Sequence, residues 1–213
     1  AAVRLAVFLR ERAFARLLTE DYSGGLTAAE VVASLVRPRM GGLTPADRDR
    51  FALLDARRGW LYLLMQAKLK GTRAIEAFDK AIQNGAFQGE PLTGRASTYI
   101  TLGQYREAIA DAAQAVEIGP PVTGLLYNAA SVYAAARPLV ERDQQAADRA
   151  VLSAAWLAES VALLRRAFEQ ADAPTRAAYW AELDRDTFFD SIRDTAELKQ
   201  LRGEFDPRGA SGK

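Results

Sequence analysis

The amino-acid sequence predicts an all-α protein, and three observations lead to this prediction. The chain is rich in alanine, a strong helix former, and its β-branched residues are scattered instead of gathered into alternating runs. Glycine and proline interrupt it at intervals of about ten to fifteen residues, as in short helices joined by turns. Parts of the sequence also recur at a fixed spacing, which is typical of stacked helix pairs.

The composition restricts the classes of function. Of 213 residues, 28 are Lys or Arg and 27 are Asp or Glu, so the formal net charge of +1 favours neither nucleic acid nor an anionic membrane. The chain has no His and no Cys, which excludes an imidazole base, a thiol nucleophile and a Cys/His zinc site. The lack of cysteine leaves the redox compartment open. We expect a cytoplasmic protein with no cofactor, no membrane span and no nucleic-acid partner.

Residues 1–43 are predicted to form an N-terminal helical extension. A first helix is expected over Val3–Glu20, and a second begins at Thr27, whose hydroxyl can cap it while Glu30 completes a capping box. Pro38 ends the second helix. Because the chain begins with alanine and not methionine, we expect it to have been processed or cut from a longer protein.

Residues 44–205 are predicted to form the main domain, followed by a flexible tail over 206–213. Thr44 and Pro45 begin a long helix that reaches about Lys68. A single helix is expected from Arg142 to Gln170. Helices are expected to end at Asn84-Gly85, Gly103, Gly119-Pro120-Pro121 and Pro138. The apolar stripe expected along one side of the long helix consists of Leu157, Val161, Leu164 and Phe168.

An internal repeat is the most informative pattern. Each member of one set of residues recurs 34 positions later (108 − 74 = 34), which is the length of a tetratricopeptide (TPR) helix–turn–helix unit. The pairs are Ala74 and Ala108, Phe78 and Ala112, Ala81 and Ala115, Ala96 and Ala130, and Tyr99 and Tyr133. The pattern predicts repeats over about 52–88, 89–122 and 123–170, the last with an insertion, and a cap over 174–205.

The segment from Gly94 to Pro120 resembles the TPR consensus. Small residues stand at Ala96, Ala108 and Ala115, where the two helices of a repeat approach closely, and Tyr99 fills the space between them. Residues 50–205 resemble the TPR tail of large multidomain bacterial proteins such as eukaryotic-like Ser/Thr kinases. The resemblance implies a right-handed superhelix of antiparallel helix pairs closed by capping helices, with Phe189 and Ile192 where that cap usually has leucine. The chain carries no kinase motif of its own.

The resemblance also implies where a partner would bind. TPR domains bind peptides on the concave face formed by the first helix of each repeat. The positions on that face are Trp60, Leu64, Glu90, Thr93, Ser97, Thr101, Tyr127, Asn128 and Ser131. The Asn128 amide could bond a peptide backbone or a neighbouring helix, and Trp60 could serve the groove or the core. The set lacks the Lys, Arg and Asn residues of chaperone-binding TPR domains, which disfavours a chaperone adaptor.

Charged residues offer weaker signals. Arg58 and Arg95 could pair with acidic neighbours on the surface or meet an acidic peptide, and surface pairing is the simpler interpretation. Asp184, Asp186 and Asp190 have the spacing of a calcium loop. Phe188 and Phe189, however, stand where such a loop needs a ligand and a glycine, so we expect no metal.

These observations predict a non-catalytic protein-interaction module, a scaffold or regulatory part of a larger signalling protein, which binds a partner segment in the TPR groove. The alternative is a domain that self-associates, as a homodimer, or packs on an attached kinase or other catalytic domain. An enzyme using carboxylate chemistry is the least favoured hypothesis, because neither a P-loop nor a nucleophile elbow is present.

Overall fold

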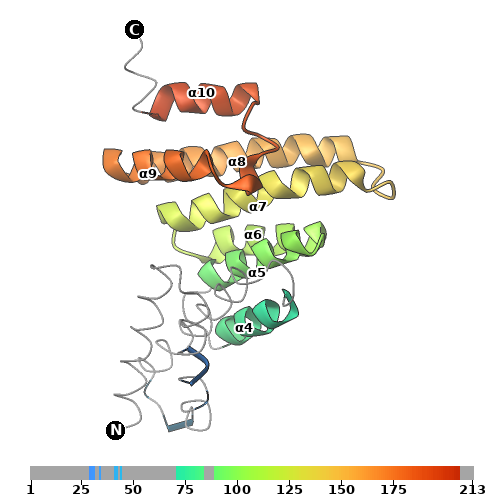
Figure 1. Cartoon of the computed structure of the whole chain (residues 1–213), viewed down its shortest axis with the longest axis vertical. Helices are drawn as coiled ribbons and strands as arrows, with labels where there is room; N and C mark the ends of the chain where they lie inside the picture. The colour runs from blue at the N-terminus through green and yellow to red at the C-terminus, as the bar shows by residue number, and fades with distance from the viewer. Residues whose placement is uncertain are drawn as a thin grey trace. The chain divides into compact units, whose positions relative to one another are not determined.

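The computed structural model describes residues 71–83 and 89–206, together with 29–31, 34, 41–42 and 44. The described residues form helices and turns without a strand, so the all-α prediction is confirmed for this part (Figure 1). The helices expected over Val3–Glu20, from Thr27 and up to Lys68 lie outside the described residues or almost entirely so, as do Arg58, Trp60 and Leu64. The chain divides into two compact units, residues 1–102 and 103–213, which are described separately.

In the first unit, α4 (Gly71–Gln83) packs against α5 (Gly89–Thr101). The buried side of α4 consists of Ala74, Ala77, Phe78 and Ala81. These residues are three or four positions apart, which places them on one face of the helix. Phe78 lies against Gly94 of α5 so closely that a Cβ atom there would stand 2.3 Å from the ring.

An ion pair also joins α4 and α5. A guanidinium nitrogen of Arg95, on α5, lies 2.6 Å from a carboxylate oxygen of Asp79, on α4. The expectation that Arg95 pairs with an acidic neighbour is therefore confirmed.

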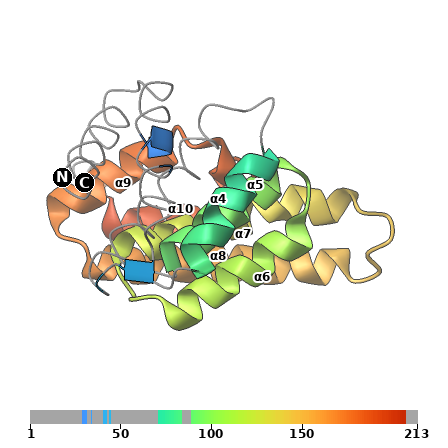
Figure 2. The same cartoon turned by 90° about the horizontal axis from the view of Figure 1, so that it is seen from below.

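The second unit begins with α6 (Tyr105–Ile118), α7 (Thr123–Arg142) and α8 (Arg149–Gln170). The stop expected at Gly103 is confirmed, because α5 ends at Thr101 and Gly103 has a φ of 76°, a left-handed conformation that favours glycine. The stop expected at Gly119 is also confirmed, since α6 ends at Ile118. In Figures 1 and 2, α7 and α8 run side by side and their connection projects at one end.

The expectation of one helix from Arg142 to Gln170 is wrong at its start. Residues 143–148 form a turn, and the Asp143 carboxylate holds it by accepting hydrogen bonds from the backbone N–H of Gln145 at 2.9 Å and the Tyr105 hydroxyl at 2.6 Å. Arg106 adds a third bond at 3.0 Å. Helices α7 and α8 have 20 and 22 residues, whereas α5 and α6 have 13 and 14. The insertion expected within residues 123–170 therefore lengthens both α7 and α8.

Unfolding in acid is expected to depend on Asp143. Its hydrogen bonds, that of Tyr105 foremost, hold the pKa of its carboxyl below the ordinary value. The carboxylate therefore stabilises the fold above about pH 4, and the contribution is lost as the pH falls through the lowered pKa. Asp143→Asn should destabilise the chain in urea unfolding at neutral pH, and the difference from wild type should shrink in acid. A difference that stays constant with pH would contradict this role, and Glu117→Gln, on an exposed part of α6, serves as the control.

The expected stop at Pro138 is also wrong, because α7 continues through this residue to Arg142. Proline has no N–H to donate to the carbonyl four residues earlier, that of Ala134. The hydroxyl of Ser191 donates to that carbonyl instead, at 2.6 Å, and the Ser191 carbonyl accepts from Arg137 at 2.8 Å. A residue more than fifty positions away thus supplies the donor that the helix lacks.

Ser191→Ala should lower the free energy of unfolding by about 1–2 kcal/mol, because it leaves the buried Ala134 carbonyl without a donor. A backbone N–H at position 138 would replace that donor. The same substitution should therefore cost less in a Pro138→Ala background. A double-mutant cycle in urea measures the difference, and equal costs in the two backgrounds would contradict the interpretation.

The buried side of α8 differs from the expected stripe. Leu164 and Phe168 are buried, but Leu157 and Val161 are only partly so. The contacts explain this, since the ring of Trp156 lies 5.8 Å from that of Tyr105 and the Ser160 hydroxyl donates to the Ala130 carbonyl at 2.8 Å. The side that faces α6 and α7 consists of Ser153, Trp156, Ser160, Leu163 and Ala167.

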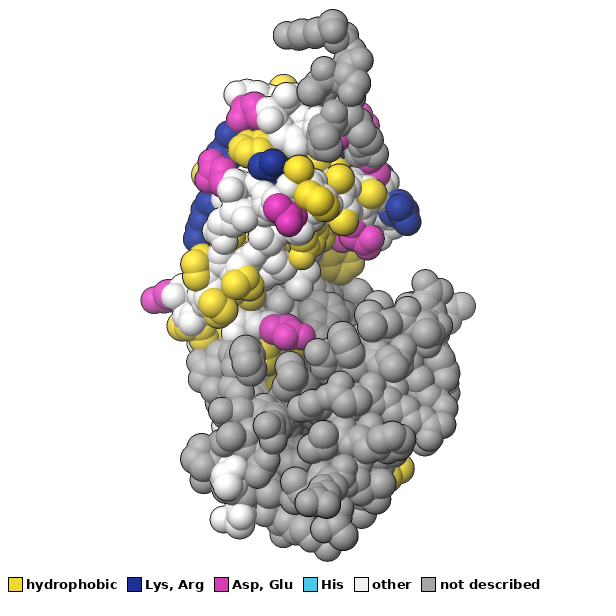
Figure 3. Space-filling model, turned by 90° about the vertical axis from the view of Figure 1, so that its left-hand side faces the viewer, with side chains coloured by type: hydrophobic (Ala, Val, Ile, Leu, Met, Phe, Trp, Pro, Cys, Tyr) yellow, Lys and Arg dark blue, Asp and Glu magenta, His cyan; other side chains and the backbone are white. Residues whose placement is uncertain are grey.

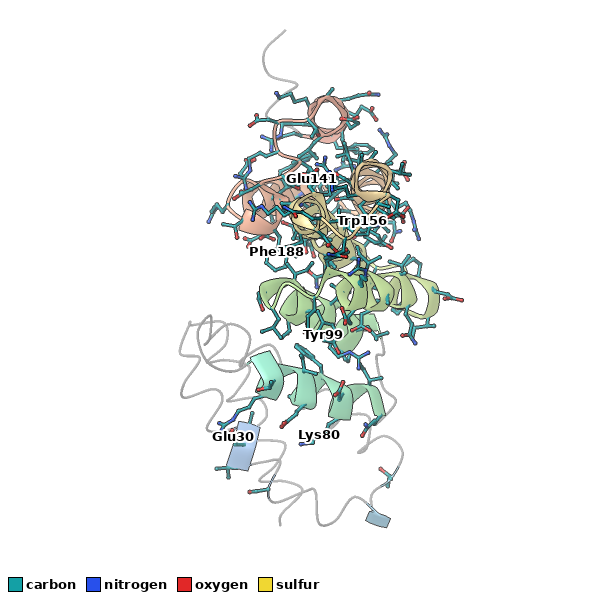
Figure 4. The ribbon with its side chains drawn as sticks, turned by 90° about the vertical axis from the view of Figure 1, so that its right-hand side faces the viewer. Glu30, Lys80, Tyr99, Glu141, Trp156 and Phe188 are labelled. Atoms are coloured by element: carbon teal, nitrogen blue, oxygen red, sulfur yellow. The ribbon has the colours of Figure 1, made fainter. Side chains whose placement is uncertain are left out.

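Residues 173–205 form a closing segment made of α9 (Ala173–Leu183), a short 3-10 helix η2 (Thr187–Phe189) and α10 (Ala196–Phe205). The closing segment contacts α7 through η2 and α8 through α10, and Phe189 and Ile192 are buried. In Figure 4, where α7 and α8 are seen nearly end-on, α8 with Trp156 lies on one side of α7 and the part of the closing segment around Phe188 on the other. Whether it is a TPR cap stays a prediction.

Candidate functional site

The first-helix face of α7 carries three of the expected groove residues. Tyr127 is 4% exposed, and its ring packs against Tyr179 at 4.7 Å and Phe189 at 5.2 Å, both in the closing segment. Ser131 is buried and donates its hydroxyl to the Asn128 carbonyl at 2.8 Å. Asn128 is half-buried. With the closing segment in place, Asn128 therefore offers more surface to a ligand than Tyr127 or Ser131.

The Tyr127 hydroxyl is buried and has no hydrogen-bond partner in the described part of the chain. Burial raises its pKa, and the nearby charges of Asp186 and Glu182 raise it further. Burial also raises the pKa of Asp186, although the hydrogen bond from the backbone N–H of Phe188 opposes this. A tyrosine with a raised pKa stays neutral at physiological pH, so Tyr127 can donate a hydrogen bond but is a poor general base.

The three aspartates with calcium-loop spacing have separate partners. Asp184 forms an ion pair with Arg202, and Asp190 forms one with Arg193 at 2.8 Å. Asp186 accepts the N–H of Phe188 at 2.9 Å, which caps η2. Among the described residues, no three acidic side chains come close enough to hold a metal ion. These carboxylates stabilise the closing segment.

The expected groove residues of α5 lie in the first unit. The hydroxyls of Thr93, Ser97 and Thr101 donate to carbonyls of their own helix, at 2.9, 2.9 and 2.7 Å. Thr93 and Ser97 are buried, Glu90 is half-buried and Thr101 is exposed. Glu90 and Thr101 are therefore the positions of α5 with surface to offer.

Sequence reasoning missed two features of this region. It did not connect Tyr179 with Tyr127, because no sequence pattern links residues of different helices so far apart. It also missed Ser191 as the partner of the Ala134 carbonyl, although a proline inside a helical pattern signals that such a donor is needed.

No family model matches the chain, and no curated protein matches it. None of the helices in the described part is long and apolar enough to cross a membrane. Figure 3 shows acidic and basic side chains interspersed with hydrophobic ones on the described part of the face drawn there. Function is therefore inferred from the helix arrangement and its surface chemistry.

Proposed function

We propose that the chain is a TPR-like, non-catalytic protein-interaction module of a larger signalling protein in the cytoplasm. The spacing of the helices carries this proposal. Helix α4 begins at residue 71 and α6 at 105, while α5 begins at 89 and α7 at 123, and both intervals are 34 residues (105 − 71 and 123 − 89). Such a period is typical of repeats that stack into an extended binding surface.

Buried small residues support the same repeat. Ala74 and Ala81 on α4 recur as Ala108 and Ala115 on α6, and all four are fully buried. Small residues at these positions let neighbouring helices approach closely. The recurrence of alanine is therefore explained by helix packing and does not simply reflect the high alanine content of the chain. The right-handed superhelix and the kinship with kinase-associated tails are part of the proposal.

The proposed ligand is an extended peptide segment that binds on the first-helix face of α7. On α7 the half-buried amide of Asn128 offers a donor and an acceptor to a peptide backbone. The expected residues of this face, Tyr127, Asn128 and Ser131, carry no charge, which favours a partner bound mainly through its backbone and apolar side chains.

Affinity capture from a lysate of the source cells tests the proposal. The baits are the wild-type chain, Asn128→Arg on the first-helix face, and Gln114→Arg on an exposed part of α6 as the matched control. Circular dichroism first establishes that all three are folded. We expect one partner to be retained by wild type and control and lost by Asn128→Arg, whereas equal recovery on all baits would contradict the assigned face.

Self-association is a second candidate function because one observation favours it. The side of α8 that faces away from α7 exposes apolar residues, including Val151 at 71%. Packing on an attached kinase or other catalytic domain has no comparable observation in the described part of the chain.

A further inference from the structure

Helix α8 is apolar on nearly all sides along its first four turns. Between Ala150 and Ala162 the polar residues are Ser153, Glu159 and Ser160. Ser153 and Ser160 are buried on the side of α7, where they bond Glu141 and the Ala130 carbonyl. A helix that is apolar all round is normally covered on all sides.

The cover is incomplete on the outward face of α8. We use this name for Val151, Ala154, Ala155, Ala158 and Ala162, all of which are exposed. Helix α10 reaches only the far end of α8, where Arg165 forms an ion pair with Glu204, and the closing segment at Phe188 lies on the other side of α7 (Figure 4). The outward face therefore has no partner in the described part of the chain.

Opposite charges stand at the two ends of the outward face. Asp148 precedes it and Arg166 follows it, 18 residues apart (166 − 148), which is five turns at 3.6 residues per turn and places both on the same side of the helix. Both are exposed, and neither forms an ion pair with another described residue. Asp148 is the N-cap residue of α8, but its side chain makes no capping hydrogen bond.

We propose that the outward face of α8 binds the same face of a second copy of the chain, with the two helices antiparallel about a two-fold axis between Trp156 and Leu157. In this arrangement Ala155 lies opposite Ala158. Val151 then lies opposite Ala162. The small side chains at the centre allow the helix axes to approach to about 8 Å.

The charges select this orientation. In the antiparallel pair, Asp148 of each copy lies near Arg166 of the other, so an attractive pair forms at both ends. A parallel pair would instead place Asp148 beside Asp148 and Arg166 beside Arg166. The face is thus complementary to itself in the antiparallel orientation alone, which is the property that an interface between identical chains requires.

The association is expected to be weak. A stable interface buries about 800 Å² on each partner, more than one helix face provides, so the dissociation constant should lie in the micromolar range. The prediction concerns a different surface from the proposed peptide site, because Asn128 belongs to the first-helix face of α7. It can therefore fail or succeed independently of partner binding.

Sedimentation velocity of the full chain between low and high micromolar concentrations tests the proposal. We expect a reversible monomer–dimer equilibrium that Ala158→Glu shifts to monomer, because the substitution places two carboxylates at the centre of the interface. Ala113→Glu makes the same change at an exposed alanine of α6 and should leave the equilibrium unchanged. A chain that is monomeric at every concentration, or a dimer that Ala158→Glu does not weaken, overturns the proposal.

Charge reversal tests the orientation. Asp148→Arg and Arg166→Asp should each raise the dissociation constant by about tenfold, because each puts like charges together at both ends of the dimer. The double variant restores opposite charges and should return to the wild-type value. If the double variant dimerises no better than the single ones, the antiparallel arrangement is wrong.

Discussion

Phe189→Ala is expected to lower the free energy of unfolding by about 3–5 kcal/mol, as for other large residues removed from a core. Phe189 is fully buried, and its ring lies against Tyr127 of α7. Its loss would leave a cavity between the closing segment and α7. Urea unfolding followed by circular dichroism measures the change.

The neighbouring residue provides a matched control for this prediction. Phe188 is only partly buried, so Phe188→Ala removes the same atoms from a more exposed site and should cost clearly less. If the two substitutions cost the same, the closing segment does not pack on α7 through Phe189 as described.

Gly94→Ala is expected to lower the free energy of unfolding by about 2–3 kcal/mol, even though alanine is the better helix former. The added Cβ would stand 2.3 Å from the ring of Phe78, which is fully buried. Combining the substitution with Phe78→Leu should cost less than the sum of the two single changes, because the smaller side chain makes room. Thermal and urea unfolding of the four chains measure the coupling.

A second glycine separates the steric effect from helix propensity. Gly203 also lies inside a helix, α10, but a Cβ atom there would meet nothing within 4 Å. Gly203→Ala should therefore stabilise the chain by about 0.5–1 kcal/mol, the ordinary gain of alanine over glycine in a helix. If both glycine substitutions change stability in the same direction, the close contact of α4 with α5 is not as described.

The helical class and the bounds of α5 and α6 could be predicted because local signals determine them. Gly103 ends a helix by adopting a left-handed backbone conformation that favours glycine, and Gly119 ends one because Pro120 follows it. Both residue types can be read from the sequence. The 34-residue spacing was likewise visible in the small residues that recur. These features depend on neighbours in the sequence and not on distant contacts.

The errors arose where distant contacts override local signals. Pro138 ends a helix by local rules, but the hydroxyl of Ser191 satisfies the carbonyl that proline leaves open. The turn after Arg142 lacks glycine and proline, and it is held instead by Tyr105 through Asp143. Neither partner can be deduced from a local pattern, because Tyr105 comes from α6 and Ser191 from the turn between η2 and α10.

The candidate site was predictable to a smaller degree. The resemblance to TPR repeats predicted Tyr127, Asn128 and Ser131 of α7 as groove residues. A repeat pattern cannot predict which of these residues the closing segment buries. Burial of Tyr127 beneath Tyr179 depends on side-chain packing between α7 and α9. Asn128 keeps enough surface for the proposed role.

The central claim is that a partner peptide binds on the first-helix face of α7. The most direct test titrates a peptide from the partner retained by wild type into three chains by calorimetry, namely wild type, Asn128→Arg and Gln114→Arg. Asn128→Arg is expected to weaken binding by at least about tenfold, equivalent to about 1.4 kcal/mol, and the α6 control is expected to bind as wild type does. Equal affinity for all three chains would contradict the claim.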